Sequence, residues 1–149
     1  MKEKDLVKHL ARVWPKVGRA LEANTAPALK RRPPTYDDHR VFQALLLYIL
    51  RGLPVRACLG RGYPMGAGLH RRWLIWRAAG ALRAMVGAYA RALPKNHLAA
   101  WRERLEEYDL QVRDHDTRNP AMAWLMVNRF WYEAVAVPLL DAGGRAGRG

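Results

Sequence analysis

The chain has 149 residues, half of them apolar, and a formal net charge of +13 at pH 7. This length suits a single domain that buries its own hydrophobic core. Cys58 is the only cysteine, which excludes an intrachain disulfide and a zinc site built from several thiolates, and it fits a reducing cytoplasm.

The excess positive charge is confined to the first two-thirds of the chain. Residues 1–93 carry 18 basic and five acidic side chains, whereas residues 94–149 carry eight of each. A GC-rich genome would explain why Arg outnumbers Lys by 20 to 6, but it would not remove acids from one stretch only. Because cations that neutralise phosphates release condensed counterions, the asymmetry favours a polyanionic partner.

No membrane segment is expected. The amino-terminus is charged and lacks the apolar core of a signal peptide. The most apolar stretch, residues 121–140, contains Asn128, Arg129 and Glu133, and charges in mid-span are costly in lipid. We therefore interpret this stretch as a buried helix.

The first predicted element is an amphipathic helix near the amino-terminus. Pro15 falls inside it and removes a backbone hydrogen bond, so we expect a kink or a restart there. The apolar stripe of this helix consists of Leu6, Leu10, Val13, Val17 and Leu21.

A proline-containing linker and a second helix follow. Residues 23–36 are expected to be extended and exposed, and they include the basic run Lys30, Arg31 and Arg32. The second helix is predicted to begin at Asp37 or Asp38, whose carboxylate can cap free amides. Its body, residues 41–50, is nearly all apolar and therefore central to the core.

Turn-forming residues end the second helix. Gly52 is predicted to be its carboxy-terminal cap, and Pro54 prevents its continuation. Residues 54–59 leave room for one short helix, and the glycine-rich segment 60–66 lacks the spacing of a phosphate-binding loop, so we interpret it as a plain turn.

One long helix is predicted over residues 67–93. Leu74 and Ile75 lie off its main stripe, so we expect a second covered surface on this helix. Trp73 and Trp76 are interpreted as core residues rather than base-stacking platforms. The main stripe comprises Leu69, Trp73, Trp76, Leu82, Val86, Tyr89 and Leu93.

Two further helices are predicted in the neutral third of the chain. Pro94 breaks the chain, and Asn96 is expected to cap a helix with an apolar stripe from Leu98 to Val112. Residues 119–120, Asn-Pro, predict the start of the last helix. Pro138 is expected to stop that helix.

These elements predict an all-α, single-domain bundle of about five helices over residues 1–140. We expect residues 141–149 to form a disordered tail. Residues 37–93 make up a basic unit, and residues 94–140 make up a neutral helical pair for packing or partner contact.

The basic unit has the order of a helix-turn-helix protein: helix, tight turn, short helix, loop and Arg-rich helix. The guanidinium group of arginine can form two hydrogen bonds with a guanine base or with a phosphate. The alternative is a bundle helix whose arginines are merely solvated. The candidate nucleic-acid contacts are Lys30, Arg31, Arg32, Arg56, Arg61, His70, Arg71, Arg72, Arg77 and Arg83.

Short motifs in this unit follow one another in a characteristic order. Residues 37–41, Asp-Asp-His-Arg-Val, open an apolar helix that leads to residues 52–56, Gly-Leu-Pro-Val-Arg. Tyr63 and residues 70–73 and 76–80, His-Arg-Arg-Trp and Trp-Arg-Ala-Ala-Gly, come next. Over residues 37 to about 90 the chain thus resembles the amino-terminal domain of bacterial DDE insertion-sequence transposases. Val55 departs from the family pattern, which has Trp there.

The resemblance implies a DNA-binding module without catalysis. The family's catalytic domain places two metal ions on three carboxylates of an RNase H-like sheet. Fewer than sixty residues follow the long helix, and they show no strand pattern. Asp114, His115 and Asp116 are the nearest metal ligands, but adjacent loop positions seldom converge. Cys58 and His70 lack a specific spacing, so we expect no enzyme, no metal and no cofactor.

Three functions remain open. The first is a transposase-like, DNA-binding protein, cytoplasmic or nucleoid-associated, that contacts the phosphate backbone through its Arg-rich helix. The second is a small helical subunit of a ribonucleoprotein, such as a CRISPR effector complex, that holds guide RNA or target strand by backbone contacts. In that case aromatic residues such as Trp101 and Trp124 would pack against identical copies or a larger partner. The alternative is that these aromatic residues are part of the protein's own core. The third is a structural interaction protein whose charge is incidental.

Overall fold

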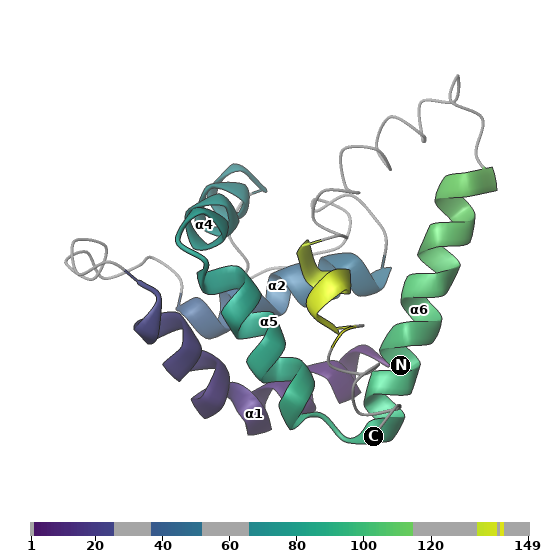
Figure 1. The fold of residues 1–149 in the computed structure, drawn as a ribbon, viewed down its shortest axis with the longest axis horizontal. Coiled ribbons are helices and arrows are strands. Elements are labelled where there is room, and N and C mark those ends of the chain that lie inside the picture. Colours follow the sequence, from purple (N-terminus) through teal and green to yellow (C-terminus); the bar gives the residue numbers. More distant parts are fainter. Residues whose placement is uncertain (1, 26–36, 52–65, 115–133, 140, 142–149) are drawn as a thin grey trace.

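The structure is a computed structural model that describes residues 2–25, 37–51, 66–114, 134–139 and 141. No strand occurs among these residues, and the predicted all-α, single-domain bundle is confirmed. The helices are α1 (Glu3–Ala23), α2 (Asp38–Arg51), α4 (Gly66–Ala78), α5 (Ala81–Ala92) and α6 (Lys95–Asp114), and residues 134–139 are also helical (Figure 1).

Several sequence predictions lie outside the described residues. They are most of the linker before α2, the cap at Gly52, the short helix at 54–59, most of the turn at 60–66, the helix start at 119–120 and most of the tail at 141–149. At the described ends of the turn and of the tail the prediction is wrong for Gly66, which begins α4, and for Asp141, which is helical.

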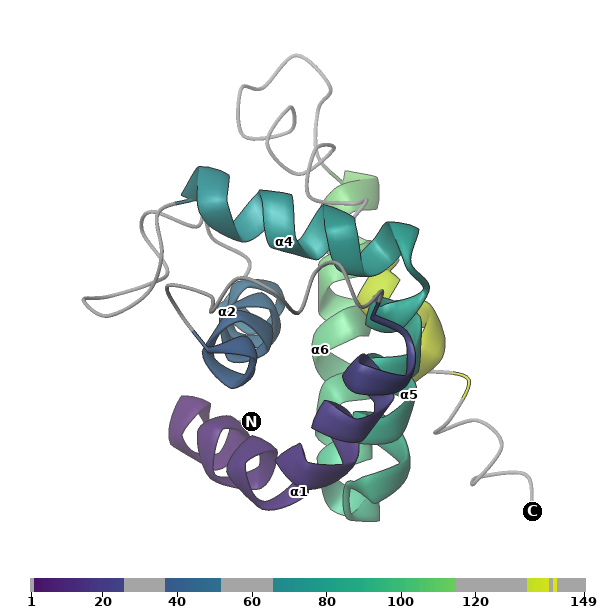
Figure 2. The same cartoon turned by 90° about the vertical axis from the view of Figure 1, so that its left-hand side faces the viewer.

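In α1 the proline produces a bend and not a break. The helix is continuous, and its axis curves so that the convex side faces away from α2 and α5 (Figures 1 and 2). Pro15 has no amide hydrogen, so the carbonyl of Ala11 receives no helical bond from it. The predicted apolar stripe is confirmed, because its members are all buried: Leu6, Leu10, Val13, Val17 and Leu21.

The predicted start of α2 is also confirmed. The Asp37 carboxylate accepts a hydrogen bond of 2.8 Å from the backbone N–H of Arg40, which is the bond expected of a helix-capping residue. At the other end, Nε of Arg104 donates to the carbonyl oxygen of Leu50 over 2.6 Å. This bond satisfies a carbonyl in the last turn of α2 and ties α6 to that helix.

The predicted long helix over residues 67–93 is wrong, because two helices occupy this stretch. Gly80 has a φ of +77°, in the left-handed region that favours glycine, and its N–H donates to the carbonyl oxygen of Arg77 over 3.1 Å. This geometry ends α4 and turns the chain into α5. Figure 2 shows α4 lengthwise across the top of the molecule and α5 running down from it.

Two predicted helix boundaries are also corrected. Asn96 does not cap α6, because the carbonyl of Pro94 accepts the first helical bond, from the N–H of Leu98 over 3.1 Å, and Asn96 lies inside the first turn. Pro138 does not stop the last helix, since Leu139 and Asp141 are helical. Pro138 removes only one backbone donor, and the burial of Leu139 in the core stabilises the helix beyond it.

The centre of the core is built around α5, which packs against α1 and α4. Tyr89 on α5 is fully buried, and its hydroxyl accepts a hydrogen bond of 3.1 Å from Nε1 of Trp101 on α6. The two rings meet edge to face at 6.5 Å. Burial raises the pKa of Tyr89 to about 12, so the hydroxyl stays neutral.

Candidate nucleic-acid interface

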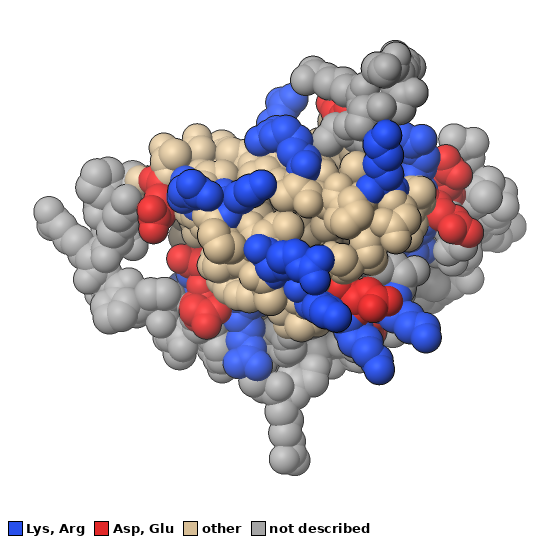
Figure 3. Space-filling model, turned by 90° about the horizontal axis from the view of Figure 1, so that it is seen from below, with Lys and Arg blue, Asp and Glu red and all other residues tan. Residues whose placement is uncertain are grey.

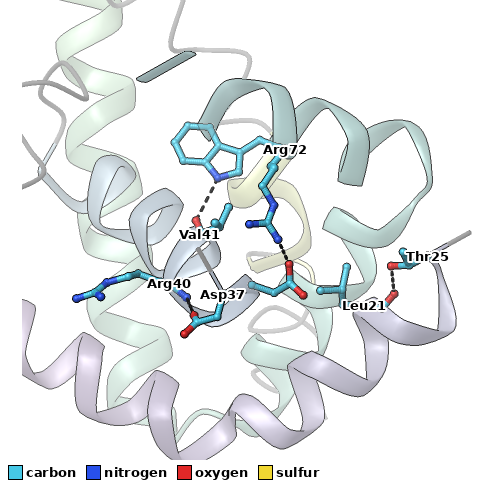
Figure 4. Close-up of polar contacts among 8 residues, drawn as sticks. Leu21, Thr25, Asp37, Arg40, Val41 and Arg72 are labelled. Carbon is cyan, nitrogen blue, oxygen red and sulfur yellow. Dashed lines mark hydrogen bonds and ion pairs between the residues drawn. The ribbon is translucent and has the colours of Figure 1, made fainter. Parts of the chain in front are cut away.

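The orientation of α4 is set by its buried side. Leu69, Trp73 and Trp76 are buried, which confirms the two tryptophans as core residues. Nε1 of Trp73 donates to the carbonyl oxygen of Val41 over 3.1 Å (Figure 4). The centre of the Trp73 ring lies 5.9 Å from the centre of the Tyr48 ring. These contacts place α4 across α2 and fix which of its sides faces solvent.

An ion pair reinforces this crossing. The guanidinium of Arg72 contacts the carboxylate of Asp38, at the first residue of α2 (Figure 4), and also lies 5.6 Å from the centre of the Trp76 ring. Burial raises the pKa of Asp38, although Arg72 acts in the opposite direction. Arg72 therefore has a clear structural task in positioning α4, whatever else it contacts.

The solvent side of α4 combines one cation with apolar side chains. Arg71, Leu74, Ile75 and Ala78 share it, and all four are exposed. We call these four residues the α4 face. Leu74 and Ile75 are 49% and 36% exposed, so the predicted second covered surface is wrong.

The sequence of α4 and α5 supplies positive charge without any acid. Residues 66–92 contain five arginines, and no Asp or Glu occurs anywhere between Asp38 and Glu103. Arg77, Arg83 and Arg91 are exposed. Because α5 departs from α4 at Gly80, Arg83 does not continue the row of α4 side chains that the single predicted helix implied.

Six further predicted contacts lie outside the side chains that the structure describes. His70 belongs to α4, but its side chain is outside the described part of the structure. The other five predicted contacts lie outside the described residues: Lys30, Arg31, Arg32, Arg56 and Arg61.

A second basic surface was missed by sequence reasoning. Lys4, Lys8, Arg12 and Lys16 recur at every fourth position of α1, on the side opposite its buried stripe, and all four are exposed. We call these residues the α1 row. No carboxylate of the described residues forms an ion pair with any of them. The four-residue spacing was the available signal.

The α1 row belongs to a broadly basic face. Figure 3 views the molecule from below, the side on which α1 lies in Figure 1. Lys and Arg side chains are spread across this face, with fewer Asp and Glu among them.

Other kinds of site find little support among the described residues. No three His, Cys, Asp or Glu side chains there gather closely enough to hold a metal ion. Asp114, His115 and Asp116, which the sequence disfavours as a metal site, lie outside the side chains that are described. No helix in the described ranges has the length and apolarity needed to span a bilayer.

No protein-family model matches the chain, and no curated protein or solved structure is significantly similar to it. The resemblance to transposase domains therefore depends on the motifs of residues 37–80 and stays a prediction.

Proposed function

We propose that this chain is a non-catalytic, nucleic-acid-binding protein whose principal contact surface is formed by α4 and the start of α5. The observation that carries the proposal is the acid-free stretch of residues 66–92, whose five arginines include four exposed ones. Such a surface gains affinity by releasing counterions from phosphates. It needs no reacting group, metal or cofactor.

Duplex DNA is the partner that the α4 face fits best. The major groove of B-DNA admits a helix, and the exposed α4 face presents one helix side to such a groove. Arg71 can meet guanine or phosphate, and Leu74 and Ile75 are suited to thymine methyl groups. The major groove of an RNA duplex is too deep and narrow for side chains to reach the base edges, which disfavours double-stranded RNA.

A salt-titrated binding assay with the full chain tests the proposal. Duplex DNA, single-stranded DNA and guide-like RNA are compared over a range of ionic strength. Stronger binding to duplex DNA with a preference among sequences is expected. Sequence-blind binding to single strands or heteroduplex would instead support the ribonucleoprotein subunit, and no binding at low salt would refute both.

Substitutions on α4 locate the surface. Each phosphate contact contributes about −0.9 to the slope of log K against log salt. The double variant Arg71→Gln, Arg77→Gln should therefore make this slope flatter by up to about 1.8. Arg102→Gln removes an exposed charge from α6 and should leave the slope within error. Equal effects from Arg71→Gln alone and Arg102→Gln alone would mean that the surface is elsewhere.

A further inference from the structure

The α1 row and the α4 face point in opposite directions. Both views place α4 at one end of the molecule, α1 at the other, and α2 and α5 between them (Figures 1 and 2). The buried side of α1 packs against α2 and α5, and the buried side of α4 packs against α5 and bonds to α2. The exposed sides of the two helices must therefore face away from each other.

One straight duplex cannot contact both surfaces, because they face opposite ways with the core between them. Packed helices lie about 8–10 Å apart, so two helix layers put about 16–20 Å between the axes of α1 and α4. The exposed side chains extend this span further on each side. A rigid duplex that touches the α4 face cannot also reach the α1 row.

The chemistry of the α1 row suits a phosphate backbone. Successive members are about 6 Å apart along the helix, and three of the four are lysines, which act as compact point charges without the planar fork of arginine. A lipid surface is a poor match, because an interfacial helix inserts its apolar side and the apolar side of α1 is buried in the core.

We propose that the α1 row binds a second segment of nucleic acid, so that one molecule of this protein bridges two segments. The second contact is sequence-blind, because it reaches phosphates and no base edges. This inference builds on the proposed function, which requires only that the α4 side bind one duplex.

A capture assay tests the bridge. One short duplex is fixed to beads, the full-length protein is added, and recovery of a labelled duplex of unrelated sequence is measured. The wild-type protein should recover it at low salt. Recovery should fall by at least about 100-fold between about 50 and 200 mM salt, because four phosphate contacts hold the second segment and the contact through α4 weakens as well.

Two variants separate the surfaces. Replacing the α1 row by Gln (K4Q, K8Q, R12Q and K16Q) should reduce recovery about tenfold or more while binding to a single duplex persists through α4. Lys→Arg at positions 4, 8 and 16 keeps the charge and should keep the bridge. Circular dichroism and thermal unfolding check that the Gln variant is folded, which is expected because all four residues are exposed and Gln favours helix.

The outcomes distinguish the two proposals. If the wild-type protein binds no single duplex, the proposed function fails. If it binds one duplex but recovers no second, or if the Gln variant still recovers it, the bridging inference alone fails. A mixture of the Gln variant with the Arg71→Gln, Arg77→Gln variant should not restore recovery; restoration would mean that separate molecules assemble to form the bridge. Retention by phosphatidylserine vesicles that depends on the α1 row, without recovery of DNA, would also overturn it.

Discussion

The α1 row and the α4 face are both positively charged, but they are built differently. The α1 row has cations at regular intervals, and the opposite side of the same helix is buried in the core. The α4 face sets one arginine beside two exposed apolar side chains, on a helix anchored by a buried tryptophan and an ion pair. Regular cations suit contact with any phosphate chain, whereas a mixed surface on a fixed helix can distinguish bases.

The largest expected effect comes from removing the anchor of α4. Trp73→Ala should lower the free energy of unfolding by about 3–5 kcal/mol, because it empties a fully buried site and deprives the Val41 carbonyl of its indole partner. Urea unfolding followed by circular dichroism measures the change. Leu74→Ala, on the exposed side of the same helix, should change the stability by no more than about 0.5 kcal/mol. Similar losses in both variants would contradict the assigned orientation of α4.

The joint between α4 and α5 is tested by a pair of glycine substitutions. Gly80→Ala should destabilise by about 1–2 kcal/mol, because the left-handed φ strains any L side chain although open space surrounds the new Cβ. Gly18→Ala in the middle of α1 should stabilise by about 0.5–1 kcal/mol, since its Cβ would meet the Trp14 ring at an ordinary 3.6 Å. Stabilisation by Gly80→Ala would favour one continuous helix after all.

The next prediction concerns the preference for DNA sequence, which should depend on the α4 face and not on the α1 row. Leu74→Ala with Ile75→Ala should reduce discrimination between thymine-containing and thymine-free duplexes by about 1 kcal/mol for each thymine methyl group that is no longer covered. The Gln variant of the α1 row should weaken binding to all duplexes alike. Competition binding with a panel of duplexes measures both, and a change of preference in the α1 variant would remove the distinction between the surfaces.

The smallest effect concerns pH and the attachment of α1 to α6. The ring centres of His9 and His97 lie 3.6 Å apart. Burial, His97 and Arg12 lower the pKa of His9 below its ordinary value of 6.5. The unfolded chain therefore binds this proton more readily than the folded protein. Stability that is fully present above pH 6.5 should decline as the pH falls below it.

His9→Gln tests the assignment, because the variant should show a flatter dependence of the urea midpoint on pH. Burial also lowers the pKa of His39, whose ring stacks on Trp14 at 4.7 Å, so part of the dependence should remain. An unchanged dependence in the His9 variant would assign the whole effect to other groups.

The sequence was sufficient for the parts of the fold that depend on local periodicity. The buried stripe of α1 follows from its spacing, and it is confirmed. The start of α2 at Asp37 or Asp38 follows from a capping carboxylate, and it is confirmed with Asp37 as the cap. The helix break was missed because alanines around Gly80 favour helix. The signal was the step of six residues from Trp76 to Leu82, which is out of phase with the helical repeat.

The candidate site was less predictable, because it depends on which helix sides the tertiary structure covers. The composition of α4 alone could not show that Leu74 and Ile75 are exposed, or that Arg72 pairs with Asp38 some thirty residues earlier. The α1 row could have been found from its four-residue spacing. Its position opposite α4 could not, since it follows from how α1 packs on α2 and α5.

The bend at Pro15 gives the α1 row the geometry of an arc. Pro15 is exposed, and the helical repeat places it on the same side of α1 as the four cations, opposite the buried stripe. This is the outer side of the curve, because the convex side of α1 faces away from α2 and α5 (Figure 2). Along a curved rod the outer path is longer than the inner one, so the cations fan apart while the buried side chains converge on the core. The bend at Pro15 thus lets the apolar stripe follow the surface of α2 and α5. It also lowers the mutual repulsion of the cations of the α1 row by spacing them further apart.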